Sequence, residues 1–361
     1  MEQEIIHPRQ FSWLVALYII GSSILILPAG IAAQAQQDAW ISAIISIGFG
    51  TALVVFYGYC MKKFPQMTMV KANEAVFGKW IGKIISLSFF SFLFLLAALV
   101  LRNIGDFLTT QILIETPLYI IFTLFMVVVL MGAGLGVETI ARACEIFFPW
   151  IFVLLTLLTI LLIPEMHFET IKPIMENGIK PIIRGSIPFI GLPFLELVVF
   201  LMIYPHVKQS QQVGRAFLRG TAMGSIILFV IIVATLLVLG ADFTARNTYP
   251  TYILAKKISI GNFVERIEVI VAIVWMLSIY FKLVLLFYAS ARTLTEVCGL
   301  QNYRLLLYPL GIGIIVLAEI SYPDIIYMQA FVTETWTLYA LIYGFFLPLL
   351  LIIVAKGRKL I

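Results

Sequence analysis

The sequence predicts an all-α polytopic membrane protein with about ten transmembrane helices in two inverted sets of five, the first and sixth helices being broken. Three observations predict this class. The 361 residues are 62% hydrophobic and only 12% charged, whereas soluble globular chains are usually about 25% charged. Apolar segments of about 20 residues, the length that crosses a bilayer, recur along the chain. Two of these segments are interrupted by Gly, Ser or Pro.

The apolar segments divide almost the whole chain among them. In chain order, the expected spans are residues 12–36, 40–60, 84–110, 118–134, 138–163, 185–205, 216–240, 265–291, 304–320 and 333–355. No polar region is left that could form a separate soluble domain. Residues 1–361 are therefore expected to form a single membrane domain.

The connection at residues 164–184 separates the two halves. Each half has an odd number of expected spans, so the second half enters the membrane from the opposite side. Residues 12–163 and 185–355 are therefore expected to be inverted five-helix repeats.

The interruptions in the first and sixth spans occupy corresponding positions in the two halves. The first lies at residues 21–23, and the second lies at residues 188–193, directly before Glu196. Irregular backbone at membrane depth persists only where protein or a polar cavity covers it, since an unsatisfied peptide group costs several kcal/mol in hydrocarbon. The matched breaks therefore indicate a small-molecule site near the bilayer midplane. The alternative is that these residues merely kink two helices.

The basic residues indicate the orientation. Most of the 24 Lys and Arg residues fall in connections that face the cytoplasm if the N-terminus is cytoplasmic. The positive-inside rule then places both termini in the cytoplasm. The net charge of +5 reflects this orientation, and the bilayer rather than nucleic acid is the expected partner of the surface.

Catalytic and metal-binding patterns are absent from the sequence. The three Cys and three His are far apart, and no phosphate-binding Walker sequence occurs. We therefore expect no metal, no cofactor and no enzymatic activity. Cysteines at cytoplasmic helix ends also argue against a disulfide framework.

Several short motifs, in order along nearly the whole chain, resemble the B subunits of spore nutrient-germinant receptors. They lie at residues 6–11, 20–28, 172–181, 193–196 and 299–309. This family is a branch of the amino acid, polyamine and organocation transporter superfamily. The resemblance implies the LeuT-like fold, a site for a free amino acid or similar nutrient, assembly with A and C subunits, and location in the inner membrane of a spore.

The break in the first span offers groups for a ligand carboxylate. Beyond Gly21, residues Ser22, Ser23 and Ile24 begin the second half of the helix, where free N–H groups and the helix dipole attract an anion. The two serine hydroxyls either add donors or bond back to the preceding turn. The other expected lining residues are Ala97 and Leu101 of the third span, which passes the site in this fold, and Gly191, Leu192, Pro193 and Leu195 of the sixth.

Two charged residues lie at similar depth in the expected spans. Glu196 either receives a ligand ammonium group or pairs with Lys282 of the eighth span, since a carboxylate at membrane depth is costly and usually functional. Lys282 could replace the cation that sodium-coupled members of this fold hold between the first and eighth helices, and so form a coupling site. The alternatives are a purely structural Glu196–Lys282 pair and a lysine that snorkels to the surface.

Other charges have helical spacing. Glu138, Arg142 and Glu145 are four and three residues apart, which suits an ion-pair ladder that acts as an inner gate or as a plain interfacial network. Arg102 and Asp106 form a similar pair near the outer end of the third span.

The leading hypothesis is an amino-acid-sensing membrane subunit that signals by conformational change. The alternatives are a proton-coupled secondary amino acid transporter and a subunit of a ligand-gated ion channel.

Overall fold

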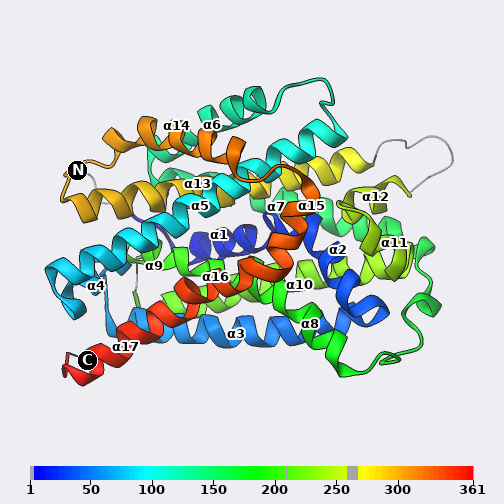
Figure 1. Cartoon of the computed structure of the whole chain (residues 1–361), viewed down its shortest axis with the longest axis horizontal. Helices are drawn as coiled ribbons and strands as arrows, with labels where there is room; N and C mark the ends of the chain where they lie inside the picture. The colour runs from blue at the N-terminus through cyan, green and yellow to red at the C-terminus, as the bar shows by residue number, and fades with distance from the viewer. Residues whose placement is uncertain (1–3, 209, 258–266, 361) are drawn as a thin grey trace.

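The computed structural model describes residues 4–208, 210–257 and 267–360, and the chain folds into a bundle of long helices (Figure 1). α6 and α14 lie along one side of the bundle in this view, and α3, α8 and α17 lie along the other. The N-terminal segment before α1 and the end of α17 are at the same end. The described chain therefore crosses the bundle an even number of times.

The first half contains seven α-helices: α1 (Pro8–Ile20), α2 (Ser23–Ala35), α3 (Ala39–Lys63), α4 (Met69–Phe77), α5 (Lys79–Gln111), α6 (Leu118–Leu135) and α7 (Val137–Leu162). α4 is a short helix between two long ones. Its N-cap, Thr68, accepts a hydrogen bond from the backbone of Lys71, which satisfies one of the free donors of the first turn.

The second half contains α8 (Ile179–Phe189), α9 (Phe200–Ile203), α10 (Ser210–Leu239), α11 (Ala241–Arg246), α12 (Pro250–Lys256), α13 (Glu268–Cys298), α14 (Arg304–Ile320), α15 (Ile325–Ala330), α16 (Thr337–Leu341) and α17 (Leu347–Gly357). Segments of π-helix at Phe331–Trp336 and Ile342–Phe346 join α15, α16 and α17 into one long path.

Eight segments of the described chain are long and apolar enough to cross a membrane. Each of the ten expected spans nevertheless corresponds to a described helix or pair of helices. α1 and α2 form the first expected span and α3 forms the second, although Ser23–Lys63 continues through a 3₁₀ turn as one apolar segment. α14, the ninth expected span, has 17 residues. The expected boundaries otherwise agree with the helices to within about seven residues. The exception is the last long path, which begins at Ile325, eight residues before the expected residue 333.

The broken elements lie at the centre of the bundle. α1 is buried along nearly its whole length and lies in the middle of the view in Figure 1. In the sixth expected span, Ile179–His206, 89% of the most apolar 18-residue stretch is buried. In α6, which is the fourth expected span, only 28% of that stretch is buried. The outer helices expose their large apolar residues instead, as in Leu124, Met131 and Trp150.

The two interruptions differ in form. In the first, Gly21 and Ser22 separate α1 from α2. In the second, the helix does not divide into two halves, because α8 continues as π-helix over Ile190–Phe194 and as 3₁₀-helix over Leu195–Val199. Pro193 lacks an N–H donor and so cannot maintain α-helical bonding. This change of winding places Glu196 in the bundle interior.

Candidate functional site

A buried ion pair joins the sixth span to α13. The Nζ atom of Lys282 lies 2.6 Å from the Oε2 atom of Glu196, and both side chains are fully buried. Removing one partner of such a pair leaves an uncompensated charge in an apolar interior. The two residues therefore depend on each other.

The Lys282 ammonium also contacts the break in the first span. It donates a hydrogen bond to Ser22 Oγ at 2.8 Å and lies 5.1 Å from the ring centroid of Tyr18. A cation at this distance from an aromatic face is attracted by the ring quadrupole. One lysine thus links the ends of α1 and α2 to the carboxylate of the sixth span.

Gly21 makes this arrangement possible. A Cβ atom at Gly21 would lie 2.8 Å from Cδ and 3.2 Å from Cβ of Lys282. These separations are shorter than a normal van der Waals contact. The glycine therefore provides the space that the lysine stem occupies beside the break.

Trp336 orients the other oxygen of Glu196. Its Nε1–H donates to Glu196 Oε1 at 3.0 Å, and its ring stacks on Phe92 with centroids 5.8 Å apart. Glu196 Oε2 has no hydrogen-bond donor in the described part of the chain beyond its ionic contact with Lys282.

A cavity of about 30 Å³ adjoins this cluster. Its wall combines polar groups from five separate segments of the chain with a larger number of apolar residues. The lining residues are Ser22, Leu96, Leu99, Val100, Asn103, Leu192, Glu196, Tyr322, Met328, Phe331, Val332 and Trp336.

The structure brings three of the sequence-predicted site residues to this cavity, namely Ser22, Leu192 and Glu196. Ser23, which follows Ser22 in the chain, is fully buried, and its Oγ atom has no hydrogen-bond partner among the described residues. The carbonyl of Ile24 accepts a hydrogen bond from Thr251 Oγ1. The hydroxyl of Ser22 therefore serves Lys282, and that of Ser23 does not bond back to the preceding turn.

The other predicted lining residues are buried but do not line the cavity. On α5, the buried Ala97 and Leu101 lie one position beyond the lining residues Leu96 and Val100.

The residues flanking Leu192 pack on neighbouring helices instead. A Cβ at Gly191 would overlap Thr337, and Gly344 packs against Leu195. Pro193 is buried in the π-helical segment. These residues shape the sixth span from behind the cavity.

Three polar residues that line the cavity were not expected from the sequence, namely Trp336, Tyr322 and Asn103. Trp336 belongs to the last span and Tyr322 to the segment before it, far along the chain from either break. Asn103 belongs to α5. A polar residue within an apolar span was the available signal for Asn103, since such residues usually face the interior.

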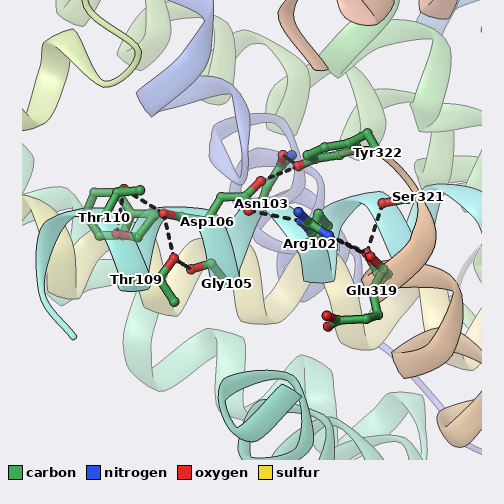
Figure 2. A network of polar contacts seen from close by, with 11 residues as sticks. Arg102, Asn103, Gly105, Asp106, Thr109, Thr110, Glu319, Ser321 and Tyr322 are labelled. Carbon is green, nitrogen blue, oxygen red and sulfur yellow. Dashed lines mark hydrogen bonds and ion pairs between the residues drawn. The ribbon is translucent and has the colours of Figure 1, made fainter. Parts of the chain in front are cut away.

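A polar network adjoins the cavity at Asn103 and Tyr322 (Figure 2). Arg102 Nε donates to Asp106 Oδ1 at 3.0 Å, as the four-residue spacing predicts. The Tyr322 hydroxyl donates to Asp106 Oδ2 at 2.5 Å, and the guanidinium lies 4.7 Å from the Tyr322 ring. Burial, with the nearby Asp106 carboxylate, raises the pKa of Tyr322 well above its ordinary value, so the hydroxyl remains a donor.

The structure contains one contact of the expected ladder among the predicted inner-gate residues, and Glu145 has a different partner. Arg142 Nη2 pairs with Glu138 Oε1 at 2.6 Å. Glu145 instead accepts a hydrogen bond from Gln10 Nε2 at 2.8 Å, and Glu138 Oε2 accepts one from the backbone of Ile5 at 3.1 Å. The acidic residues of α7 therefore bind the N-terminal segment, which comprises residues 4–10 and includes the first turn of α1.

The N-terminal segment also binds the second half of the chain. Tyr288 donates to Glu4 Oε2 at 2.6 Å. Ile6 pairs with Val207 as a single parallel bridge, supported by the bond from Ile6 N to His206 O at 2.9 Å. The segment thus joins α7, α13 and the end of the sixth span at one end of the bundle.

No group of three or more His, Cys, Asp or Glu side chains within the described ranges could hold a metal ion. The site consists of a charge-balanced pair, a helix break and an apolar cavity.

Together these features define an integral membrane protein with the fold of small-molecule transporters. The structure is similar to that of MhsT in complex with L-phenylalanine, with a TM-score of 0.69 and 14% identity, covering 98% of this chain and 99% of that chain. It is also similar to Mhp1, a nucleobase-cation-symport-1 family transporter, with a TM-score of 0.64 and 15% identity, covering 94% of this chain and 76% of the other. The predicted all-α, LeuT-like fold is confirmed.

The sequence defines the family more closely. Residues 5–323 match the model of the spore germination protein family, and the chain belongs to that family. It is 27% identical to spore germination protein KB of Bacillus subtilis over 88% of this chain and 85% of the relative. It is 25% identical to spore germination protein A2 of the same organism over 96% and 94% of the two chains. Fold and family together support a membrane role in nutrient sensing or transport.

Proposed function

We propose that this chain is the nutrient-sensing membrane subunit of a spore germination receptor and binds a free amino acid at the cavity beside Ser22 and Glu196. It acts by binding and conformational change and catalyses no reaction. The observation that carries the proposal is the cluster of Gly21, Ser22, Glu196 and Lys282, where a helix break and a buried ion pair adjoin one cavity.

The start of α2 supplies a site for the ligand carboxylate. The first N–H groups of a helix have no partner within the helix, and the helix dipole favours an anion there. Ser22 lines the cavity at this point, and the buried Ser23 Oγ has no partner in the described structure. A carboxylate would satisfy both the backbone donors and this hydroxyl.

Glu196 supplies a site for the ligand ammonium. Its Oε2 atom contacts only the Lys282 ammonium among described donors. An arriving ammonium can share this carboxylate or displace Lys282 toward Ser22 and Tyr18. Because Glu196 and Lys282 balance each other, a zwitterion adds no net charge to the interior, whereas a singly charged ligand would.

The small volume of the cavity supports signalling by conformational change. Ligand pockets usually have volumes of about 300–1,000 Å³, and this cavity has about 30 Å³. An amino acid therefore requires a more open arrangement of the surrounding helices. A ligand that binds only the open arrangement shifts the population toward it.

The same proposal includes the assembly and the location. Relatives named spore germination proteins A2, B2 and KB support assembly with A and C subunits in the spore inner membrane. The distribution of Lys and Arg supports cytoplasmic termini. The N-terminal segment and the acidic residues Glu138 and Glu145 would then close the cytoplasmic end as an inner gate.

Binding and uptake by the purified chain test the proposal. We expect a panel of free amino acids to include a ligand that binds the wild-type chain in lipid nanodiscs, and we expect proteoliposomes not to accumulate it. Absence of binding by every amino acid would refute the proposal.

Proton-coupled transport is the second candidate, favoured by the fully buried Lys282–Glu196 pair beside the cavity. A charged residue buried at membrane depth beside a cavity is usually functional. Accumulation of the ligand driven by a pH gradient would establish this function. Ion flux on ligand addition without accumulation would instead indicate a channel subunit.

A further inference from the structure

The residues with oxygen or amide groups that line the cavity form two pairs from different parts of the chain. Ser22 and Glu196 are the inner polar end, beside the break in the first span, and Asn103 and Tyr322 are the outer polar end. The other lining residues, the apolar belt, are Leu96, Leu99, Val100, Leu192, Met328, Phe331, Val332 and Trp336. A ligand that contacts both pairs would present a polar group to each.

The outer end carries no net charge. Arg102 donates to Asp106 Oδ1 at 3.0 Å and to the carbonyl of Glu319 at 2.8 Å. These contacts are visible in Figure 2. Since the guanidinium and the carboxylate compensate each other, this end offers no free charge to a ligand side chain. It favours a neutral group.

Asn103 retains hydrogen-bonding capacity toward the cavity. The single hydroxyl proton of Tyr322 is committed to Asp106 Oδ2 at 2.5 Å, so the contact between that hydroxyl and Asn103 Oδ1 at 3.3 Å is the weaker of the two. Asn103 Nδ2 donates no hydrogen bond to the described residues. An amide has donors and an acceptor, so whichever end faces Tyr322 leaves the other end for a ligand.

The side chain of Asn103 also points along the same face of α5 as the belt. Leu96, Val100 and Asn103 are four and three residues apart and share one helix face. All three line the cavity. A ligand held by its amino acid group at Ser22 and Glu196 would direct its side chain along this face toward Asn103.

We propose that Asn103 is a specificity-determining residue and that the ligand is a net-neutral amino acid whose side chain ends in an amide or a hydroxyl. This inference rests on the proposed function, because it takes the inner polar end as the site of the amino and carboxylate groups. Amide and hydroxyl groups both donate and accept, so they complement either orientation of the Asn103 amide. An aliphatic ligand would cover the partly buried Asn103 amide without giving it a hydrogen-bond partner.

Calorimetric titration of the full-length chain in nanodiscs with glutamine, asparagine, threonine, leucine and glutamate tests the proposal. We expect one of the first three to bind at least roughly tenfold more tightly than leucine and glutamate, since an unpaired buried polar group penalises the aliphatic ligand. In Asn103→Leu this preference should disappear or reverse in favour of leucine. Asn177→Leu in the outer connection, away from the cavity, is the matched control and should keep the wild-type order.

Asn103→Ala guards against a folding defect in the leucine variant. It removes the amide without adding volume, and it should also lose the preference. A wild-type chain that binds leucine most tightly, or an unchanged order in both variants, would overturn this inference and leave the proposed function standing. Failure of every amino acid to bind the wild-type chain would overturn both.

Discussion

Gly21 and Lys282 are in direct contact, and the lysine stem occupies the space where any other residue at position 21 would place its Cβ atom. The predicted separation of 2.8 Å between that Cβ and Lys282 Cδ leaves no room for alanine unless Lys282 moves. A displaced Lys282 would lose its contacts with Ser22 and Glu196. The glycine at the break is thus coupled to the buried charge pair.

Gly21→Ala should therefore weaken ligand binding by about tenfold or more, because loss of one charge-assisted hydrogen bond costs about 1.5–3 kcal/mol. Gly30→Ala is the matched control in the same span, since a Cβ there has nothing within 4 Å. Binding is measured by calorimetry. Equal affinities in the two variants would exclude the contact with Lys282 as a determinant of the site.

Lys282→Met should lower the free energy of unfolding by about 3–5 kcal/mol, because it leaves Glu196 buried without its counter-ion. Adding Glu196→Gln should restore much of this loss, since the double variant buries no charge. Denaturant titration in detergent micelles measures the effect. Lys172→Met removes an exposed partner of Glu169 and should cost about 0–1 kcal/mol; a similar loss in both lysine variants would contradict the prediction.

Trp336→Phe should weaken ligand binding by about fivefold to a hundredfold, since the lost donor leaves Glu196 Oε1 unsatisfied at a cost of about 1–3 kcal/mol. The aromatic ring that stacks on Phe92 is retained, so stacking is largely preserved. Trp150→Phe, on an exposed surface, should change neither affinity nor stability. Wild-type affinity in Trp336→Phe would show that the indole does not position Glu196 for the ligand.

Weakening the N-terminal segment should expose the inner end of the bundle. Cys144, beside Glu145, is buried, whereas Cys298 is exposed. Labelling of the Cys298 thiol therefore shows that the maleimide was active in every sample. We expect Glu145→Ala, which removes the bond to Gln10, to speed maleimide labelling of Cys144 severalfold. Glu169→Ala, in an exposed pair far along the chain, serves as the comparison. Unchanged Cys144 labelling in Glu145→Ala would argue against a closing role for this segment.

The helical class, most span boundaries and the break at Gly21 followed from the sequence, because apolar length and helix-breaking residues are local properties. The sequence placed Glu196 and Lys282 at similar membrane depth, where charges are costly unless paired, but it left their contact as one of several alternatives. The division into repeats at residues 12–163 and 185–355 stays a prediction.

Three-dimensional packing decided the rest. Whether Leu96 or Ala97 faces the cavity depends on helix rotation, which a nearly uniform apolar helix such as α5 does not reveal. Trp336 and Tyr322 come from the end of the chain, and only the fold brings them to Glu196. The partner of Glu145 is Gln10, a neutral residue that charge spacing alone does not identify.

α1 connects two parts of the molecule that lie far apart. Its 13 residues form a rod of roughly 20 Å at about 1.5 Å per residue, with the N-terminal segment at one end and Gly21 at the other. A displacement of the N-terminal segment along α1 would therefore reach the contact between Gly21 and Lys282. For this reason an affinity tag or fluorescent protein fused ahead of Glu4 would itself disturb the readout of ligand binding. The end of α17 offers no better position, because α15, α16 and α17 form one long path that carries Trp336 to the cavity.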